Sequence, residues 1–127
     1  MGVFVYRGHN IMASTNEFAE FILEMLELFG SVRAKRMFGG FGLYLDETMF
    51  ALIADDTLYF KVDDHSRVEF ESLGMQAFRY AKNGKEYKMS YYGVPEDALE
   101  NPEELSRFAQ LGYDAALRCS REKKQIA

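Results

Sequence analysis

The sequence has 127 residues, 48% of them hydrophobic, and a formal net charge of −5 from 15 bases and 20 acids. This length suits one domain with its own core, and the apolar content is too high for a disordered chain. No apolar stretch is long enough to span a bilayer, which excludes a helical membrane protein. A single cysteine, Cys119, excludes an internal disulfide and is typical of a reducing, cytoplasmic compartment.

The N-terminal region predicts an arm followed by a helix. Residues 1–12 lack the pattern of a secretory signal peptide, and we expect them to form a loose arm. Ser14 and Glu17 have the spacing of a capping box that opens a helix. Apolar residues then recur three and four positions apart as far as Phe29, which predicts an amphipathic helix that ends at Gly30.

Four segments with the composition of strands follow this helix, separated by short turns. Connections of about two residues cannot carry a crossover helix, so we expect neighbouring strands to run antiparallel. The third segment is apolar at every position, which predicts a central strand covered on both faces. The four segments are Arg33–Phe38, Phe41–Asp46, Met49–Ala54 and Leu58–Val62.

The second half predicts two more helices and a hairpin. Asp63 or Asp64 can cap a short helix that runs through Leu73. The turn of the hairpin, between residues 77–82 and 85–92, is Asn83-Gly84, and both of these residues tolerate positive φ. Pro102 is favourable in the first turn of a last helix. We expect that helix to run to about Ser120.

The order helix, four strands, helix, two strands, helix predicts the fold class. An antiparallel sheet of five to six strands with flanking helices forms an α+β domain. We expect residues 13–121 to form this single domain and residues 122–127 to form a basic tail.

The residues that could carry chemistry do not form a catalytic pattern. The two histidines, His9 and His65, are not accompanied by a nucleophile motif. Two aspartate pairs flank one predicted strand, about 20 Å apart at 3.3 Å per residue, so they cannot share one metal ion. The glycines of the MFGGFGLY segment precede a strand, whereas a phosphate loop needs a helix N-terminus. We therefore expect a binding module with no cofactor, not an enzyme.

Five residues are candidates for contact with a partner. Arg33, Lys35 and Arg36 precede the glycine turn, and Tyr91 and Tyr92 lie on the last predicted strand. Patches of both charge signs favour a protein partner, and tyrosine beside basic residues suits a protein interface. Two alternatives remain open. Adjacent tyrosines point to opposite faces of a strand, so one of them can pack in the core, and the basic hairpin and tail can bind nucleic acid directly.

Two stretches of the sequence carry a family resemblance, RAKRMFGGFGLYLDETMFALIADDTLYFKVDD and YAKNGKEYKMSYYGVPEDALENPEEL. They resemble the N-terminal domain of the TfoX/Sxy family of bacterial competence regulators, and the likeness runs from about Asn16 to Arg118. The resemblance implies an α+β sandwich similar to secretion chaperones, a class that works through protein contact. It carries over no catalytic residues.

The same resemblance implies a regulatory role. Family members look like transcriptional co-regulators that act with the cyclic-AMP receptor protein and RNA polymerase at competence promoters. The resemblance therefore implies a protein-binding module whose partner belongs to the transcription machinery. Full-length members resemble a two-domain arrangement, so we expect this sequence to be a stand-alone N-terminal form. A homodimer stays open as an alternative.

Overall fold

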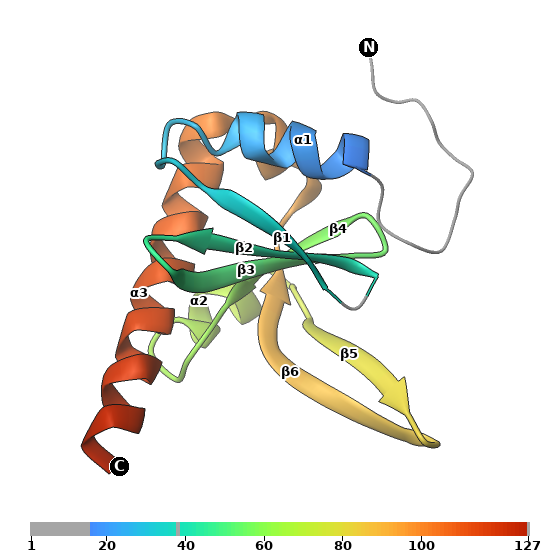
Figure 1. Cartoon of the computed structure of the whole chain (residues 1–127), viewed down its shortest axis with the longest axis vertical. Coiled ribbons are helices and arrows are strands. Elements are labelled where there is room, and N and C mark those ends of the chain that lie inside the picture. Colours follow the sequence, from blue (N-terminus) through green and yellow to red (C-terminus); the bar gives the residue numbers. More distant parts are fainter. Residues whose placement is uncertain (1–15, 38, 127) are drawn as a thin grey trace.

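The computed structural model describes residues 16–37 and 39–126 (Figure 1). One open, six-stranded antiparallel sheet has the strand order β1-β2-β3-β4-β6-β5, and helices pack against it. The predicted α+β class is confirmed. In chain order the elements are α1 (Asn16–Met25), β1 (Arg33–Met37), β2 (Gly40–Leu45), β3 (Thr48–Ala54), β4 (Thr57–Lys61), α2 (Arg67–Ser72), β5 (Ala77–Lys82), β6 (Lys85–Gly93), the short 3-10 helix η2 (Glu96–Glu100) and α3 (Pro102–Ile126).

Three hairpins turn on two residues that both have positive φ. These pairs are Asp46-Glu47, Asp55-Asp56 and Asn83-Gly84. Two consecutive residues with positive φ form a type I′ turn, whose twist matches that of the flanking strands. The tight turns therefore set an antiparallel register for β2–β3, β3–β4 and β5–β6, as the short connections predict.

The three α-helices pack on one face of the sheet. Helix α3 lies across β3 and β4. The contact is close at Gly112, where a Cβ atom would meet the Phe50 carbonyl oxygen at 3.0 Å and the Phe60 Cβ at 3.2 Å. A register shift between β2 and β3 lets the consecutive residues Phe50 and Ala51 both be buried. The largest fully buried side chains are Phe50, Phe60, Phe70, Phe108, Ile22, Leu26, Leu43, Ile53, Leu58 and Leu105.

Both terminal helices differ in length from the predictions. Helix α1 ends at Met25, and the chain then tightens into turns in which the Phe29 N–H donates to the Leu26 carbonyl at 2.9 Å. The predicted cap, Ser14, and the predicted arm lie outside the described residues. Helix α3 continues to Ile126 rather than ending near Ser120, because residues 121–126 include neither glycine nor proline. Within residues 16–37 and 39–126, no helix combines the length and the apolarity needed to cross a membrane.

The prediction that Met49–Ala54 is covered on both faces is wrong. The strand is central in the sheet, and Ala51 and Ile53 are buried on the helical side. Met49 and Leu52, however, are only half-buried. The reason is that the helices of the described part of the chain all pack on one side, so neighbouring strands alone shield the other side of β3.

Candidate functional site

The sheet face opposite the helices, called the open face below, is formed by alternate strand residues. In β2, Leu43 is fully buried toward the helices, so its neighbours Gly42 and Tyr44 project to the other side. The thioethers of Met37 and Met49 flank the same side, because their sulfurs lie 3.0 and 3.1 Å from the position of a Cβ on Gly42. In Figure 1, β1, β2 and β3 lie in front of α3, and no described helix covers them from the viewer's side.

The centre of the open face is apolar and adaptable. Gly42 is paired with Leu52 of β3 and with Lys35 of β1. Met37, Met49 and Leu52 are half-buried around this glycine. Gly42 is buried, and the Met37 and Met49 thioethers close over it, so that a Cβ atom there would meet their sulfurs at 3.0 and 3.1 Å. Methionine side chains are flexible and polarizable, so this cover can adapt its shape to an apolar group packed on it from outside the chain.

Two cations lie over tyrosine rings near this centre. The Arg33 Cζ lies 6.0 Å from the Tyr44 ring centroid, and the Lys61 Nζ lies 5.3 Å from that of Tyr91. Lys61 also donates a hydrogen bond of 2.8 Å to the Ser90 hydroxyl. Burial raises the pKa of Tyr91 to about 12, so its phenol is neutral at physiological pH. These contacts hold Lys61 beside the apolar centre.

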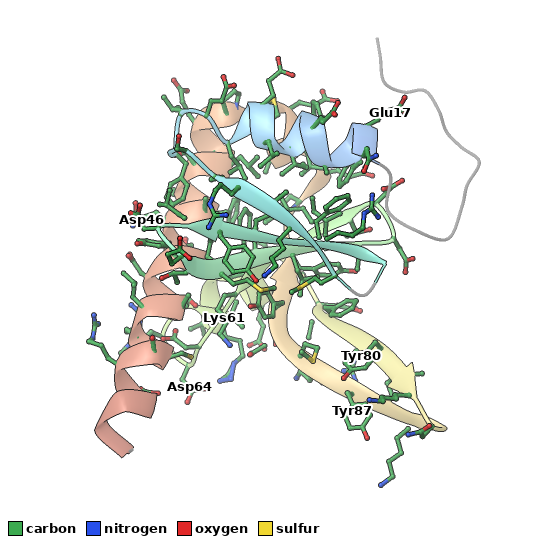
Figure 2. All side chains as sticks on the ribbon, viewed as in Figure 1. Glu17, Asp46, Lys61, Asp64, Tyr80 and Tyr87 are labelled. Carbon is green, nitrogen blue, oxygen red and sulfur yellow. The ribbon has the colours of Figure 1, made fainter. Side chains whose placement is uncertain are left out.

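An aromatic row extends the open face along the β5–β6 hairpin, which projects beyond the helices (Figure 2). Tyr59 of β4 contacts Phe78 at 4.9 Å between ring centroids, and Phe78 stacks on Tyr80 at 6.2 Å. Tyr80 is paired across the hairpin with Tyr87, at 5.5 Å. These last two rings are 41% and 42% exposed. The hairpin thus offers exposed aromatic area continuous with the sheet.

The bases of the chain are concentrated on the strands, and the acids lie almost entirely on helices and turns. The six strands carry eight of the 15 bases but only one of the 20 acids, Glu86. Glu86 pairs with Ala81 and contacts Arg79 at 3.6 Å, which places it on the other side of the hairpin from Tyr80. Strand alternation places five bases on the open face: Arg33, Lys35, Lys61, Lys82 and Lys85.

The strand residues of the open face therefore carry positive charge although the whole chain is negative. Acids from turns border this face, and the Asp55 charge adds to burial in raising the pKa of Tyr59. Among the strand residues that project to it, none is an acid. An acid from a turn, Glu47, contacts Arg33 at 3.4 Å, and both side chains are largely exposed, so this pair neutralises part of the charge at one edge. Lys35 is paired with Gly42 and Arg33 is two residues away on the same strand, whereas Lys61 lies two strands away on β4.

Comparison with known proteins places the chain in a family. Residues 24–116 match the TfoX N-terminal domain. The chain belongs to this family. It is 30% identical over 95 residues to Protein Sxy of Escherichia coli (strain K12), and 30% identical over 96 residues to DNA transformation protein TfoX1 of Aliivibrio fischeri (strain ATCC 700601 / ES114). The matches cover 75% and 76% of this chain and 46% of each relative, so the chain spans about half the length of these relatives.

In this TfoX N-terminal domain, three of the five predicted partner-binding residues share the open face. They are Arg33, Lys35 and Tyr91. Arg36 points to the helical side, where its guanidinium donates a hydrogen bond of 2.6 Å to Asn16 and lies 4.7 Å from the Phe41 ring centroid. The structure therefore separates Arg36 from the other bases of β1, and it leaves partner binding by any of them as a prediction.

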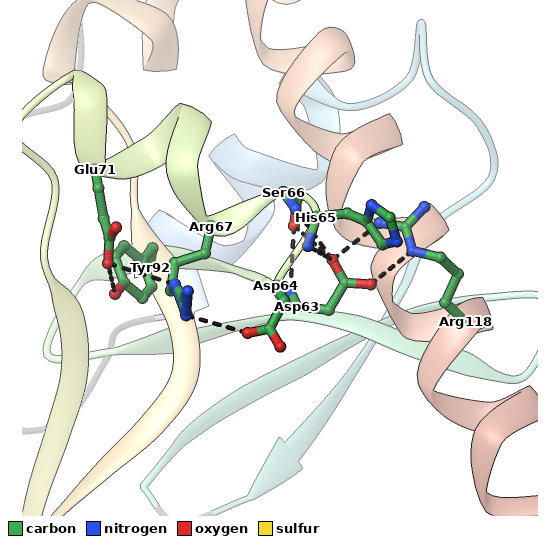
Figure 3. A network of polar contacts seen from close by, with 8 residues as sticks. All are labelled: Asp63, Asp64, His65, Ser66, Arg67, Glu71, Tyr92 and Arg118. Atoms are coloured by element: carbon green, nitrogen blue, oxygen red, sulfur yellow. Dashed lines mark hydrogen bonds and ion pairs between the residues drawn. The ribbon is translucent and has the colours of Figure 1, made fainter.

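Tyr92 belongs to the core. It is 3% exposed, its ring meets Phe70 at 6.3 Å, and its hydroxyl donates a hydrogen bond of 2.6 Å to a Glu71 carboxylate oxygen (Figure 3). This hydrogen bond and burial raise the pKa of Tyr92. Of the two adjacent tyrosines, Tyr92 is thus the one that packs inward. A surface built from both of them is not formed.

We expect Tyr92→Phe to lower the free energy of unfolding by about 1 kcal/mol, because the variant loses one hydrogen bond to a partly exposed carboxylate and keeps the ring contacts. Urea denaturation followed by circular dichroism measures this loss. Glu71→Gln is the matched control, since its amide oxygen can still accept from the phenol. An unchanged unfolding midpoint in Tyr92→Phe would show that this hydrogen bond contributes nothing.

A second polar group joins the start of α2 to α3 (Figure 3). One Asp63 oxygen accepts from Arg118 Nε at 2.6 Å, and the other accepts from Arg118 Nη2 at 3.0 Å and from the backbone N–H groups of His65 and Ser66 at 3.1 Å. The hydrogen bond with Arg118 is the main reason that the pKa of Asp63 lies well below its usual range. Asp63 thus anchors the turn that precedes α2 (Arg67–Ser72), whose N-cap residue is Ser66 and not the predicted Asp63 or Asp64.

This network is a structural clamp between the start of α2 and α3. Arg118 holds the Asp63 carboxylate in its charged form, and the contact with His65 uses the backbone N–H rather than the imidazole. In the described residues, no three carboxylate, histidine or cysteine side chains gather where they could hold a metal ion. The open face is therefore the better candidate for function.

Proposed function

We propose that this chain is a non-enzymatic regulatory module that binds a protein partner through its open face and takes part in the control of DNA transformation. The open face is the observation that supports this function. Its apolar centre of methionine and leucine is bordered by tyrosine, arginine and lysine, the combination in which protein interfaces are rich. One relative is named a DNA transformation protein, and shared family membership supports carrying that role to this chain.

A transcriptional route is part of this proposal. The module would act on competence-type genes by contact with a protein of the transcription machinery, as the family resemblance implies. The separation of charge between strands and helices supports such a contact, because oppositely charged surfaces orient a partner and speed its association.

Direct binding of nucleic acid is the second candidate, and the eight bases on the strands favour it. A titration of labelled duplex DNA between 50 and 200 mM salt separates the two candidates. Binding through six to ten phosphate contacts would weaken about 10³- to 10⁵-fold over this range. The protein-binding proposal predicts no measurable binding even at 50 mM salt.

The main test is an exchange of domains in Aliivibrio fischeri. In a strain that lacks TfoX1, the segment of TfoX1 that matches this chain is replaced by residues 16–126, and transformants are counted after addition of marked DNA. We expect the chimera to restore transformation, because the two segments belong to one family. TfoX1 without the matching segment is the negative control.

If the chimera does not restore transformation, its cellular level must be compared with that of intact TfoX1. A chimera that accumulates to the level of intact TfoX1 and yields no more transformants than the deletion strain would contradict the proposed function. The substitutions described in the next subsection are then introduced into an active chimera, which tests whether transformation depends on the open face.

A further inference from the structure

We infer that the partner segment bound by the open face is acidic and packs an apolar side chain on the methionine-rich centre around Gly42. This inference rests on the proposed function and names the chemistry of the partner. Two features of the face carry it: a half-buried apolar centre and basic side chains around it.

The apolar centre determines the apolar part of the inference. The half-buried Met37 and Met49 thioethers cover Gly42, where a Cβ atom would contact their sulfurs at 3.0 and 3.1 Å, and the half-buried Leu52 is paired with this glycine. A phosphate or sugar gains nothing from covering thioethers and a leucine, whereas an apolar side chain removes them from water. The centre of the open face therefore fits a protein segment better than a nucleic acid.

The surrounding charges determine the acidic part. Lys35 lies directly across from Gly42 in the β1–β2 register, and Lys61 is held on the same face by Ser90 and Tyr91. No strand residue that projects to this face is an acid. Carboxylates that border an apolar anchor would meet these ammonium groups at the rim, where charge pairs mainly set association rate and specificity.

A second copy of the chain is the competing occupant. Helix α1 presents exposed Glu17, Glu20 and Glu24, which would suit a basic surface. However, Ile22 of α1 is fully buried, and none of the large apolar side chains that are exposed in the described part of the chain lies in α1, the nearest being Leu28 in the turns after it. We therefore assign the open face to a different protein and let the test decide on self-association.

The test selects ligands from a display library of short random peptides on the immobilised chain. Enriched peptides are then synthesised with a fluorescent label, and their affinities are measured by anisotropy. We expect the enriched peptides to carry net negative charge and at least one large apolar residue. Labelled oligo-dT and the chain itself at increasing concentration are measured in parallel.

Two pairs of variants connect binding to the open face. Lys35→Glu/Lys61→Glu reverses the charge of the rim, and Lys88→Glu/Arg121→Glu makes the same change in charge at exposed residues on the other hairpin face and on α3. We expect a loss of affinity of about tenfold or more for the first variant and little change for the second. The single variant Lys35→Glu replaces the double one if circular dichroism shows that the double variant is unfolded.

The second pair tests the apolar centre without a change in charge. Gly42→Ala places a methyl group 3.0 and 3.1 Å from the two methionine sulfurs, so their flexible ends must move aside and the shape of the apolar centre changes. Gly93→Ala is the matched control, since the nearest atom to its added Cβ is the Leu58 carbonyl oxygen at 4.0 Å. We expect weaker peptide binding, by several-fold, only for Gly42→Ala.

Four results would overturn the inference. The first two are that no peptide is enriched on the folded chain, or that the enriched peptides carry no net negative charge. The third is that oligo-dT binds more tightly than the peptides and that its affinity also depends on Lys35 and Lys61. The fourth is that the chain self-associates and that the open-face variants abolish this association. If one of these results is found but the chimera is active and needs the open face, the proposed function still holds and only the chemistry of the partner is wrong. If the chimera is inactive but the open face binds acidic peptides, the role in transformation is rejected and the open face is still a peptide-binding surface.

Discussion

Replacing Phe60 by alanine is expected to lower the free energy of unfolding by about 3–5 kcal/mol. Phe60 is fully buried in β4, and its ring stacks on that of Phe50 at 6.1 Å. On the other side it lies under Gly112 of α3, so close that a Cβ there would touch it. The variant therefore leaves a cavity between sheet and helix that neither layer can close easily, and the loss is a large part of the about 5–15 kcal/mol typical of a whole domain.

Chemical denaturation in urea measures this effect, with Phe78→Ala as the matched control. Phe78 is also an aromatic strand residue, but it is half-buried on the open face against Tyr59. We expect Phe78→Ala to cost clearly less than Phe60→Ala, because water can fill the space that it leaves. Equal losses for the two variants would contradict the assignment of one face to the core and the other to solvent.

Local sequence patterns were sufficient to predict the elements of this fold. The two-residue turns at Asp46-Glu47, Asp55-Asp56 and Asn83-Gly84 can be found from neighbouring residues alone, and they determine the antiparallel pairing. Pro102 likewise begins α3, as its fixed φ predicts. The helix ends were less accurate, because the end of α1 depends on tertiary packing and α3 has no residue that stops it.

The candidate site depended on information that the sequence does not contain locally. Alternation shows that Lys35 and Arg36 point to opposite faces, but only the packing of the helices shows which face is open. The same holds for Tyr91 and Tyr92. The sequence alone does not indicate Lys61 as a candidate residue, because its partners, Ser90 and Tyr91, are about thirty residues away and on a different strand.

The clamp between α2 and α3 was also beyond the sequence. Asp63 has the appearance of a simple helix cap, yet its main partner is Arg118, 55 residues later. An arginine near the end of a predicted helix has many conceivable carboxylate partners in a chain with 20 acids. Only the folded arrangement selects one of them.

Arg118→Ala is expected to lower the free energy of unfolding at pH 7 by about 2–3 kcal/mol. The substitution removes two hydrogen bonds of 2.6 and 3.0 Å and leaves the Asp63 carboxylate, whose side chain is only 16% exposed, without its cationic partner. Fully buried pairs lose about 3–5 kcal/mol in this way, and the partial exposure of Arg118 reduces the figure. Arg121→Ala, an exposed arginine nearby on α3, is the control and should change stability by no more than about 0.5 kcal/mol.

The pH dependence of this loss tests its electrostatic origin. Arg118 holds the folded-state pKa of Asp63 below the value of about 3.9 for an unfolded aspartate. A lowered pKa stabilises the fold above the unfolded value, and this stabilisation is lost as the pH falls and Asp63 takes up a proton. Wild type and Arg118→Ala should therefore differ most above about pH 5, and the difference should shrink steadily as the pH falls below about 4 toward the lowered folded-state pKa of Asp63. A difference that stays constant down to pH 3 would mean that Arg118 stabilises the domain by packing along α3 and not through Asp63.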